Sequence, residues 1–242
     1  MDNVFEILSQ KGLNALIFSD PYAKLCCTAA LVRHCCLHAQ KRDRIRTPDP
    51  VKRVVYIDLD TTFSAFVKGG LILRELIFVP KIENKNIFTI QTMEDIRKNL
   101  LIYIPVMGSF ESILSHVIDS MSESALVIVD SLNSFFNLYY DKIKIETGYG
   151  LSSVNHLLSA FIMLLVRFGW DSHVPILVTS MLRYKKKVSW IHIPASNRLL
   201  RRKSIVTLFV EMINESDLSL RITDHPSRPK ETLIFNDYGI RL

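Results

Sequence analysis

The stretch Ala125-Leu126-Val127-Ile128-Val129-Asp130-Ser131-Leu132 decides the fold, because it is an apolar run that ends in a carboxylate and a hydroxyl. Continuous apolar runs rich in β-branched residues are typical of strands that are buried on both faces of a sheet. Open α/β sheets bind their ligands at the carboxyl ends of such strands. We therefore predict a buried strand over Ala125–Val129 and expect Asp130 at a ligand-binding edge of the sheet.

The composition is that of a folded protein with one large α/β domain or two small ones. The chain has 242 residues, of which 48% are hydrophobic and 22% charged. Its formal net charge of +6 favours an acidic partner such as nucleic acid. No uninterrupted apolar run reaches the ~18 residues of a membrane span, and the first residues lack a signal-peptide pattern, so we expect an intracellular protein with no membrane partner. The four cysteines are then expected to be reduced thiols rather than zinc ligands: Cys26, Cys27, Cys35 and Cys36.

Short apolar runs alternate with segments of helical spacing along the chain. Strands are predicted at Leu13–Phe18, Val54–Leu59, Leu100–Pro105, Ala125–Val129 and Pro175–Thr179. Helices are predicted at Leu25–Ala39, Phe63–Ile77, Phe110–Met121 and Ser152–Gly169, the last with Ser152 or Ser153 as its N-cap. We expect a turn over Ser19–Ala23 and an irregular basic segment over Arg183–Lys203.

Three short strands end the sequence, and we expect them to extend the sheet in antiparallel fashion: Ile205–Met212, Leu218–Asp224 and Glu231–Phe235. Alternating strands and helices imply a mainly parallel sheet with right-handed crossovers. The prediction is one α/β domain over residues 1–242, in which residues 1–12 form a short N-terminal segment.

The order of several motifs resembles the core of RecA/RadA-type recombinases. The motifs are Val54-Val55-Tyr56-Ile57-Asp58-Leu59-Asp60-Thr61-Thr62-Phe63, the Walker B-like run Leu126–Phe136, Gly148–Ser153, Pro175–Met181 and the closing segment Leu220–Ile240. The resemblance extends from about Ala15 to Leu242. It implies a RecA-like core: a mainly parallel sheet flanked by helices, with a C-terminal antiparallel extension.

The phosphate-binding loop of that family is degenerate in this chain. Such a loop needs glycines whose N–H groups surround the phosphates, a lysine, and a hydroxyl for Mg²⁺. In the matching segment, Ser19 and Lys24 replace the two glycines, Leu25 stands at the lysine position and Cys26 at the hydroxyl position. We therefore expect no ATP or Mg²⁺ cofactor in this chain alone. The alternative is weak ATP binding in a shifted register, in which Lys24 reaches a phosphate.

Other positions depart from the family's catalytic pattern as well. Asp60 stands where the resemblance places the catalytic glutamate, one methylene shorter, and Ser180-Met181 replaces the Asn-Gln sensor pair. Asp130 retains the Walker B position. It is either a remaining Mg²⁺ ligand or a strand-end carboxylate that caps N–H groups and positions a partner-facing loop, and we favour the second interpretation. We assign no catalytic residue and no metal.

Much of the positive charge lies where the family carries its second DNA-binding loop. Cations that neutralise phosphates and aromatic rings that stack on bases are typical of single-stranded DNA sites. The alternatives are a solvated loop or one ordered against a protein partner. The candidate residues are Arg183, Tyr184, Lys185, Lys186, Lys187, Arg198, Arg201, Arg202 and Lys203.

Taken together, the resemblance and its departures imply a nuclear, non-catalytic recombinase paralogue. We expect it to form a heteromer with another paralogue, and to bind or stabilise recombinase filaments on single-stranded DNA in homologous recombination repair. The alternatives are a weak ATPase with an atypical loop and a scaffold subunit of another RecA-like ring that acts on RNA. We do not expect a filament-forming recombinase, because only residues 1–12 precede the first strand.

Overall fold

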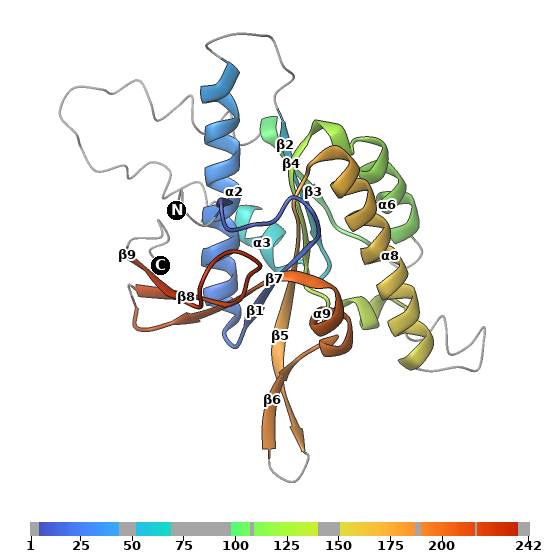
Figure 1. Cartoon of the computed structure of the whole chain (residues 1–242). Helices are drawn as coiled ribbons and strands as arrows, with labels where there is room; N and C mark the ends of the chain where they lie inside the picture. Colours follow the sequence, from blue (N-terminus) through green and yellow to red (C-terminus); the bar gives the residue numbers. More distant parts are fainter. Residues whose placement is uncertain are drawn as a thin grey trace, which may run out of the picture.

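One sheet organises the residues that the computed structural model describes, which are 5–43, 52–68, 98–106, 109–139, 151–186, 190–215 and 217–236. The strand order is β3-β2-β4-β5-β1-β7-β8-β9, and β6 pairs with β5 outside this path. The neighbours from β3 to β7 run parallel, whereas β8 and β9 are antiparallel additions (Figure 1). The parallel strands are β1 (Leu13–Phe18), β2 (Arg53–Asp58), β3 (Leu100–Tyr103), β4 (Ser124–Asp130), β5 (Ile176–Lys186) and β7 (Ser204–Met212).

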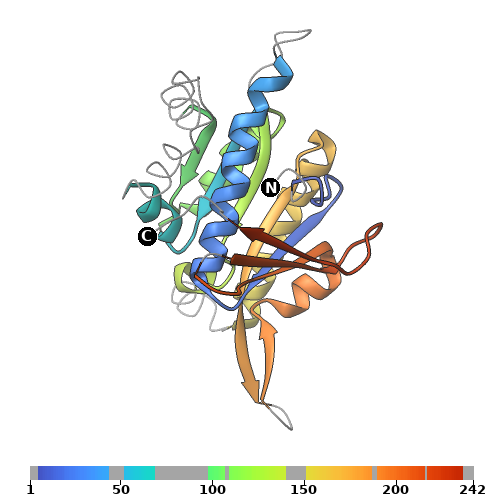
Figure 2. The same cartoon turned by 90° about the vertical axis from the view of Figure 1, so that its left-hand side faces the viewer.

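The remaining elements are the later strands and the helices. The strands are β6 (Trp190–Pro194), β8 (Asp217–Asp224) and β9 (Thr232–Asn236). The helices are α2 (Pro21–Asp43), α3 (Thr62–Lys68), α6 (Phe110–Asp119), the 3₁₀ turn η1 (Met121–Glu123), α8 (Leu151–Ser172) and α9 (Asn197–Lys203). Helices α2 and α3 cover one face of the sheet, and α6 and α8 cover the other (Figures 1 and 2).

The central strand β4 is buried on both faces, as its apolar run predicts. Leu126 and Ile128 pack in the cluster on the α2 face, whereas Val127 and Val129 pack in the cluster under α6 and α8. This alternation follows from the two-residue period of a strand. Because β2 and β4 pair in parallel with Asp58 opposite Asp130, both carboxylates lie at the same edge of the sheet.

Several boundaries differ from the sequence predictions. The predicted turn over Ser19–Ala23 is wrong, because α2 begins at Pro21. The described residues of Arg183–Lys203 are mostly regular, contrary to the prediction: β5 continues to Lys186, β6 pairs with it, and α9 follows. The predicted N-cap at Ser152 or Ser153 is also wrong, since α8 begins at Leu151. Finally, the first of the three predicted C-terminal strands, β7, is antiparallel to β8 but pairs in parallel with β1, so the antiparallel extension consists of β8 and β9.

Parts of several predictions lie outside the described residues. These parts are the helix beyond Lys68, the motif residues Gly148–Gly150, the candidate Lys187 and the closing Gly239-Ile240.

Helix α8 is apolar over most of its length. The segment Ser153–Ser172 meets the length and hydropathy criteria of a membrane span, and 39% of it is buried inside the protein. Its Leu158, Ile162 and Leu165 side chains are buried in the cluster between the helices and the sheet. Because core helices meet the same criteria, we interpret α8 as a core helix.

The end of α8 approaches β5 closely at Gly169. A Cβ atom at this position would lie 2.8 Å from the Ile176 side chain and 2.8 Å from the Val174 carbonyl oxygen. We predict that Gly169→Ala lowers the free energy of unfolding by about 1–3 kcal/mol through overpacking, although alanine is the better helix former. Urea denaturation measures the effect. The matched exchange Ala160→Gly, at an exposed position of α8, should cost about 1 kcal/mol by propensity alone. A stabilised Gly169→Ala protein would contradict this close packing.

Candidate functional site

The connection between β1 and α2 consists of two residues, Ser19 and Asp20. Asp20 is the N-cap of α2, because its Oδ1 accepts a hydrogen bond from the Tyr22 N–H at 2.8 Å and its carbonyl accepts the first helical bond, from the Lys24 N–H, at 3.2 Å. Pro21 occupies the first helical position, where its missing N–H leaves no donor unpaired. A carboxylate of the chain itself therefore occupies the helix N-terminus at which phosphates commonly bind.

This early helix start separates the residues of the predicted nucleotide site. Ser19 is exposed at the strand end, whereas Leu25 and Cys26 face the core on the α2 side of the sheet. The Asp-Pro pair is the signal that could have located the helix start, since an N-cap acid before a first-turn proline is typical of one.

Lys24, Asp60 and Asp130 are brought together by the fold. The Lys24 Nζ lies 2.8 Å from Asp130 Oδ2 and 3.2 Å from Asp60 Oδ2, and its side chain is only 1% exposed. The ammonium also lies 5.5 Å from the centre of the Phe18 ring, within the range of a cation–π contact. The first turn of α2 is thereby joined to the ends of β2 and β4.

Asp130 is the centre of this polar network. Its Oδ2 also accepts a hydrogen bond from the Tyr56 hydroxyl on β2, and its Oδ1 accepts one from the Thr179 hydroxyl on β5. Tyr56 is held in place by stacking on Phe63, with ring centroids 3.8 Å apart. The sequence motifs predict no role for Tyr56 or Thr179. Their signal is their place on the two strands that flank β4: Tyr56 lies near the end of β2, and Thr179 is the last residue of the predicted strand Pro175–Thr179.

Asp58 completes a cluster of three carboxylates with Asp60 and Asp130. One oxygen from each lies within 4.8 Å of the others. Asp58 Oδ2 accepts the Ser64 N–H at 2.7 Å, whereas its buried Oδ1 has no hydrogen-bond partner. Ser131 adds a hydroxyl that donates to Asp60 Oδ2 at 3.3 Å.

Burial and the neighbouring charges set the protonation of these groups. Burial is the main cause that raises the pKa of Asp58 to about 6; hydrogen bonds from Ser64 lower it in part, and the negative charges of Asp130 and Asp60 add to the rise. Burial also raises the pKa of Asp130, in part offset by Lys24. Burial alone would raise the pKa of Asp60, but the Lys24 ammonium lowers it below its ordinary value. For Lys24, burial opposes the charge, yet Asp130 and Asp60 raise its pKa, so the ammonium form persists.

The residues present do not fit a magnesium-bound nucleotide. A phosphate-binding loop requires free N–H groups and glycines between strand and helix. Here the connection is two residues long, Asp20 adds negative charge at the helix end, and the Lys24 ammonium lies between the two carboxylates. At the sensor position, Ser180 donates to the Ala195 carbonyl at 2.7 Å.

The predicted DNA-binding residues lie on the hairpin of β5 and β6 and on α9. Arg183 and Tyr184 are exposed on β5, and the Tyr184 ring contacts that of His192 across the hairpin, with centroids 4.1 Å apart. Lys185 and Lys186 also belong to β5. On α9, Arg198, Arg201, Arg202 and Lys203 are all exposed. Among the described residues, none of these arginines forms an ion pair with a carboxylate.

The hairpin, α8 and α9 enclose a cavity of about 710 Å³. Its lining is rich in cations and hydrogen-bonding groups, and it includes Tyr184 and polar residues of α8. The cationic and aromatic lining residues are His156, Arg183, Tyr184, Arg198, Arg202 and Lys203. The structure thus gathers most of the predicted DNA contacts around one opening.

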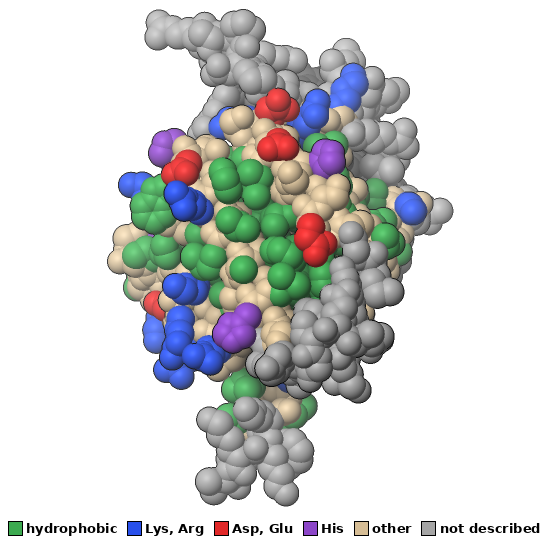
Figure 3. All heavy atoms as spheres, turned by 90° about the vertical axis from the view of Figure 1, so that its right-hand side faces the viewer, with side chains coloured by type: hydrophobic (Ala, Val, Ile, Leu, Met, Phe, Trp, Pro, Cys, Tyr) green, Lys and Arg blue, Asp and Glu red, His purple; other side chains and the backbone are tan. Residues whose placement is uncertain are grey.

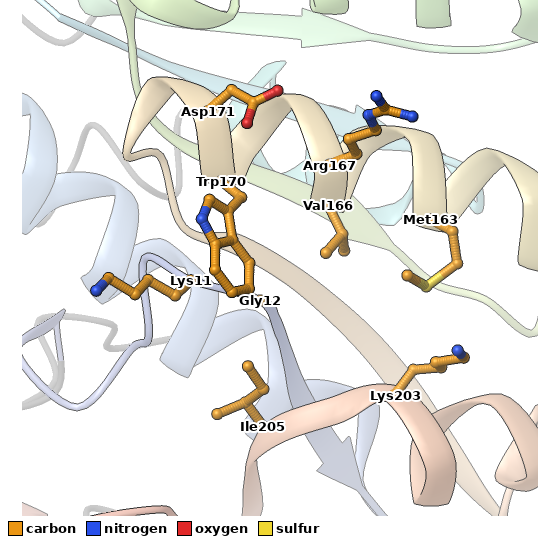
Figure 4. A pocket seen from close by; sticks show the side chains of 9 residues that line it. All are labelled: Lys11, Gly12, Met163, Val166, Arg167, Trp170, Asp171, Lys203 and Ile205. Atoms are coloured by element: carbon orange, nitrogen blue, oxygen red, sulfur yellow. The ribbon is translucent and has the colours of Figure 1, made fainter.

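A second, smaller pocket of about 400 Å³ lies where α8 passes the starts of β1 and β7. Trp170 and Met163 extend into it from α8, opposite Ile205, and Lys11, Arg167 and Lys203 lie at its margin (Figure 4). Apolar side chains gather on the face of the molecule shown in Figure 3. Leu164 and Phe168 of α8 remain 42% and 38% exposed.

The sheet order, the flanking helices and the acidic cluster at the carboxyl ends of the strands define a RecA-like α/β fold. The structure matches a solved structure described as the RadB recombinase, with a TM-score of 0.63 and 16% sequence identity, over 96% of this chain and 91% of that one. No protein-family model matches the sequence, and no curated protein sequence matches it. At this identity the likeness establishes the RecA-like recombinase fold that the sequence motifs predict.

The raised pKa of Asp58 predicts a pH-dependent stability. A carboxyl group whose pKa rises on folding, here from 3.8 to about 6, destabilises the folded state progressively as the pH increases through this range, and the destabilisation stays constant at higher pH. Asp58→Asn should therefore raise the melting temperature at pH 7.5, with a free-energy gain of at most about 3 kcal/mol. The gain should disappear below about pH 4, where both side chains are neutral.

Thermal unfolding of both proteins between pH 4 and pH 8 tests this dependence. Asp119→Asn, which removes an exposed carboxylate of α6, is the matched control and should show no such pH-dependent gain. A loss of stability at pH 7.5 in the Asp58 variant would contradict the prediction.

Proposed function

We propose that this protein is a non-catalytic recombinase paralogue. In this proposal it forms a heteromer with another paralogue and binds or stabilises recombinase filaments on single-stranded DNA in homologous recombination repair, in the nucleus. ATP hydrolysis belongs to the partner subunit. The RecA-like fold, shared with a protein described as a recombinase, supports the class of function.

The observation that carries the proposal is the two-residue connection between β1 and α2. With Asp20 capping the helix, the chain offers a nucleotide neither glycine N–H groups nor an open helix end. A subunit that does not bind nucleotide by itself acts through the surfaces that it presents to partners.

The basic hairpin and α9 support single-stranded DNA as one of these partners. Their exposed arginines surround a cavity with an aromatic ring at its side, which suits phosphates and bases respectively. The competing explanation is that Arg201, Arg202 and Lys203 stabilise the last turn of α9 by their charge alone. The two explanations differ in what charge reversal does to DNA binding.

Calorimetry with Mg·ATP tests the nucleotide half of the proposal. We expect no heat of binding for the chain alone, and binding together with co-purification once a recombinase paralogue is present. Saturable binding by the lone chain, abolished by Lys24→Ala, would instead support the weak ATPase. Binding of structured RNA without any effect of a recombinase paralogue would support the alternative ring scaffold.

Charge reversal tests the DNA half. Arg198→Glu combined with Arg202→Glu should weaken binding of a fluorescein-labelled oligothymidylate at least tenfold, because two phosphate contacts are lost. The slope of log affinity against log salt should also fall by about 1 for each lost contact. Fluorescence anisotropy at several salt concentrations measures both quantities.

The control reverses two exposed lysines on other elements, Lys52→Glu and Lys68→Glu, with the same change in net charge. Equal losses in the two double variants would mean that only overall charge matters, and would remove the hairpin and α9 from the DNA site.

A further inference from the structure

We propose that Lys24 is a tethered cation that replaces a divalent metal ion among Asp58, Asp60 and Asp130. In this view, removing its side chain converts the cluster into a binding site for Mg²⁺ or Mn²⁺. The inference concerns the acidic cluster alone and does not depend on any partner or DNA.

The contacts of Lys24 are those of a bound cation rather than of a surface ion pair. Its ammonium touches carboxylates from two different strands, at 2.8 Å and 3.2 Å, and almost none of its side chain reaches solvent. Exposed ion pairs contribute little because water screens them, whereas a buried charge must be compensated by its neighbours. The two carboxylates are therefore stable here only beside a cation, and the Lys24 ammonium is stable only beside the carboxylates.

The acidic cluster has the chemistry of a site for a hard divalent ion. Three carboxylates that can each supply an oxygen lie within 4.8 Å of one another, and Mg²⁺ and Mn²⁺ favour oxygen ligands. A second observation points the same way: Asp58 Oδ1 is buried and has no hydrogen-bond partner. One lysine provides a single positive charge for three carboxylates, so the cluster keeps an excess of acidic groups.

The helix start explains how a lysine reaches this position. Because Asp20 and Pro21 begin the helix directly after β1, Lys24 falls in the first turn of α2, beside the carboxyl ends of the strands. Its ammonium lies near the Phe18 ring and contacts both Asp60 and Asp130. A cation attached to the chain cannot dissociate, so neither chelators nor free metal ions should affect the native protein.

The test compares the native protein with Lys24→Ala by thermal unfolding in EDTA and in increasing MgCl₂ or MnCl₂. We expect the native melting temperature to be the same in all of these solutions. Lys24→Ala should melt at a lower temperature in EDTA and recover saturably with either ion, because an ion that binds only the folded state stabilises it. Mn²⁺ bound to this variant should be detected by electron paramagnetic resonance at about one ion per chain.

Two further variants make the result decisive. Lys24→Ala with Asp60→Asn and Asp130→Asn removes the lysine together with its two carboxylate partners and leaves only Asp58, so it should neither need nor bind a divalent ion. Lys24→Ala with Asp58→Asn has one carboxylate fewer and should fold more easily, while it keeps the two lysine-binding carboxylates as ligands.

Three results would overturn the inference. One is Mn²⁺ binding or Mg²⁺ stabilisation in the native protein, because Lys24 would then not be the permanent occupant. Another is indifference of both Lys24→Ala variants that retain Asp60 and Asp130 to divalent ions. The third is failure of both to fold even when Mg²⁺ or Mn²⁺ is present.

Discussion

The pairing of Lys24 with Asp130 and Asp60 is the interaction on which the functional edge of the sheet depends. Burying an ammonium or a carboxylate alone is strongly unfavourable, so each of these groups is stable inside the protein only because the others are there. The pairing in turn requires α2 to begin at Pro21, which the Asp20 cap ensures. The residues that start one helix thus determine the chemistry at the carboxyl edge of the sheet, where α/β folds bind their ligands.

The sequence predicts the sheet well because its central strands are continuous apolar runs. The first strand has the predicted bounds, Leu13–Phe18, since burial on both faces leaves a clear pattern. The prediction fails at Arg183–Lys203, where β5 extends past the apolar run into charged residues that, in the part of the chain the structure describes, pair only with β6. A charged hairpin that leaves the core has neither apolar alternation nor a turn signal strong enough to mark it, and its composition resembles that of a loop.

The sequence names some residues of the site, but not all of them and not their arrangement. Lys24, Asp60 and Asp130 follow from motif positions, yet their contact depends on where a helix begins and how far one side chain reaches. Because the segment after β1 resembles a phosphate-binding loop, a turn was predicted there. The helix start that Asp20 and Pro21 indicate was therefore not predicted. Tyr56 and Thr179 acquire their role only because β2 and β5 flank β4, and such a strand order is a property of the whole fold.

The acidic cluster and the basic region formed by the hairpin and α9 therefore differ in how their charges are compensated. At the acidic cluster, the chain supplies its own cation and its own helix cap, and the polar groups of Asp130 are all bound to protein atoms. In the basic region, the exposed arginines of the hairpin and α9 have no carboxylate partner among the described residues. Lys24 offsets part of the charge of the largely buried acidic cluster, whereas the cations of the hairpin and α9 are exposed, so these cations contribute most to the field that an approaching molecule meets. An anionic molecule would be attracted to the hairpin and α9 rather than to the acidic cluster.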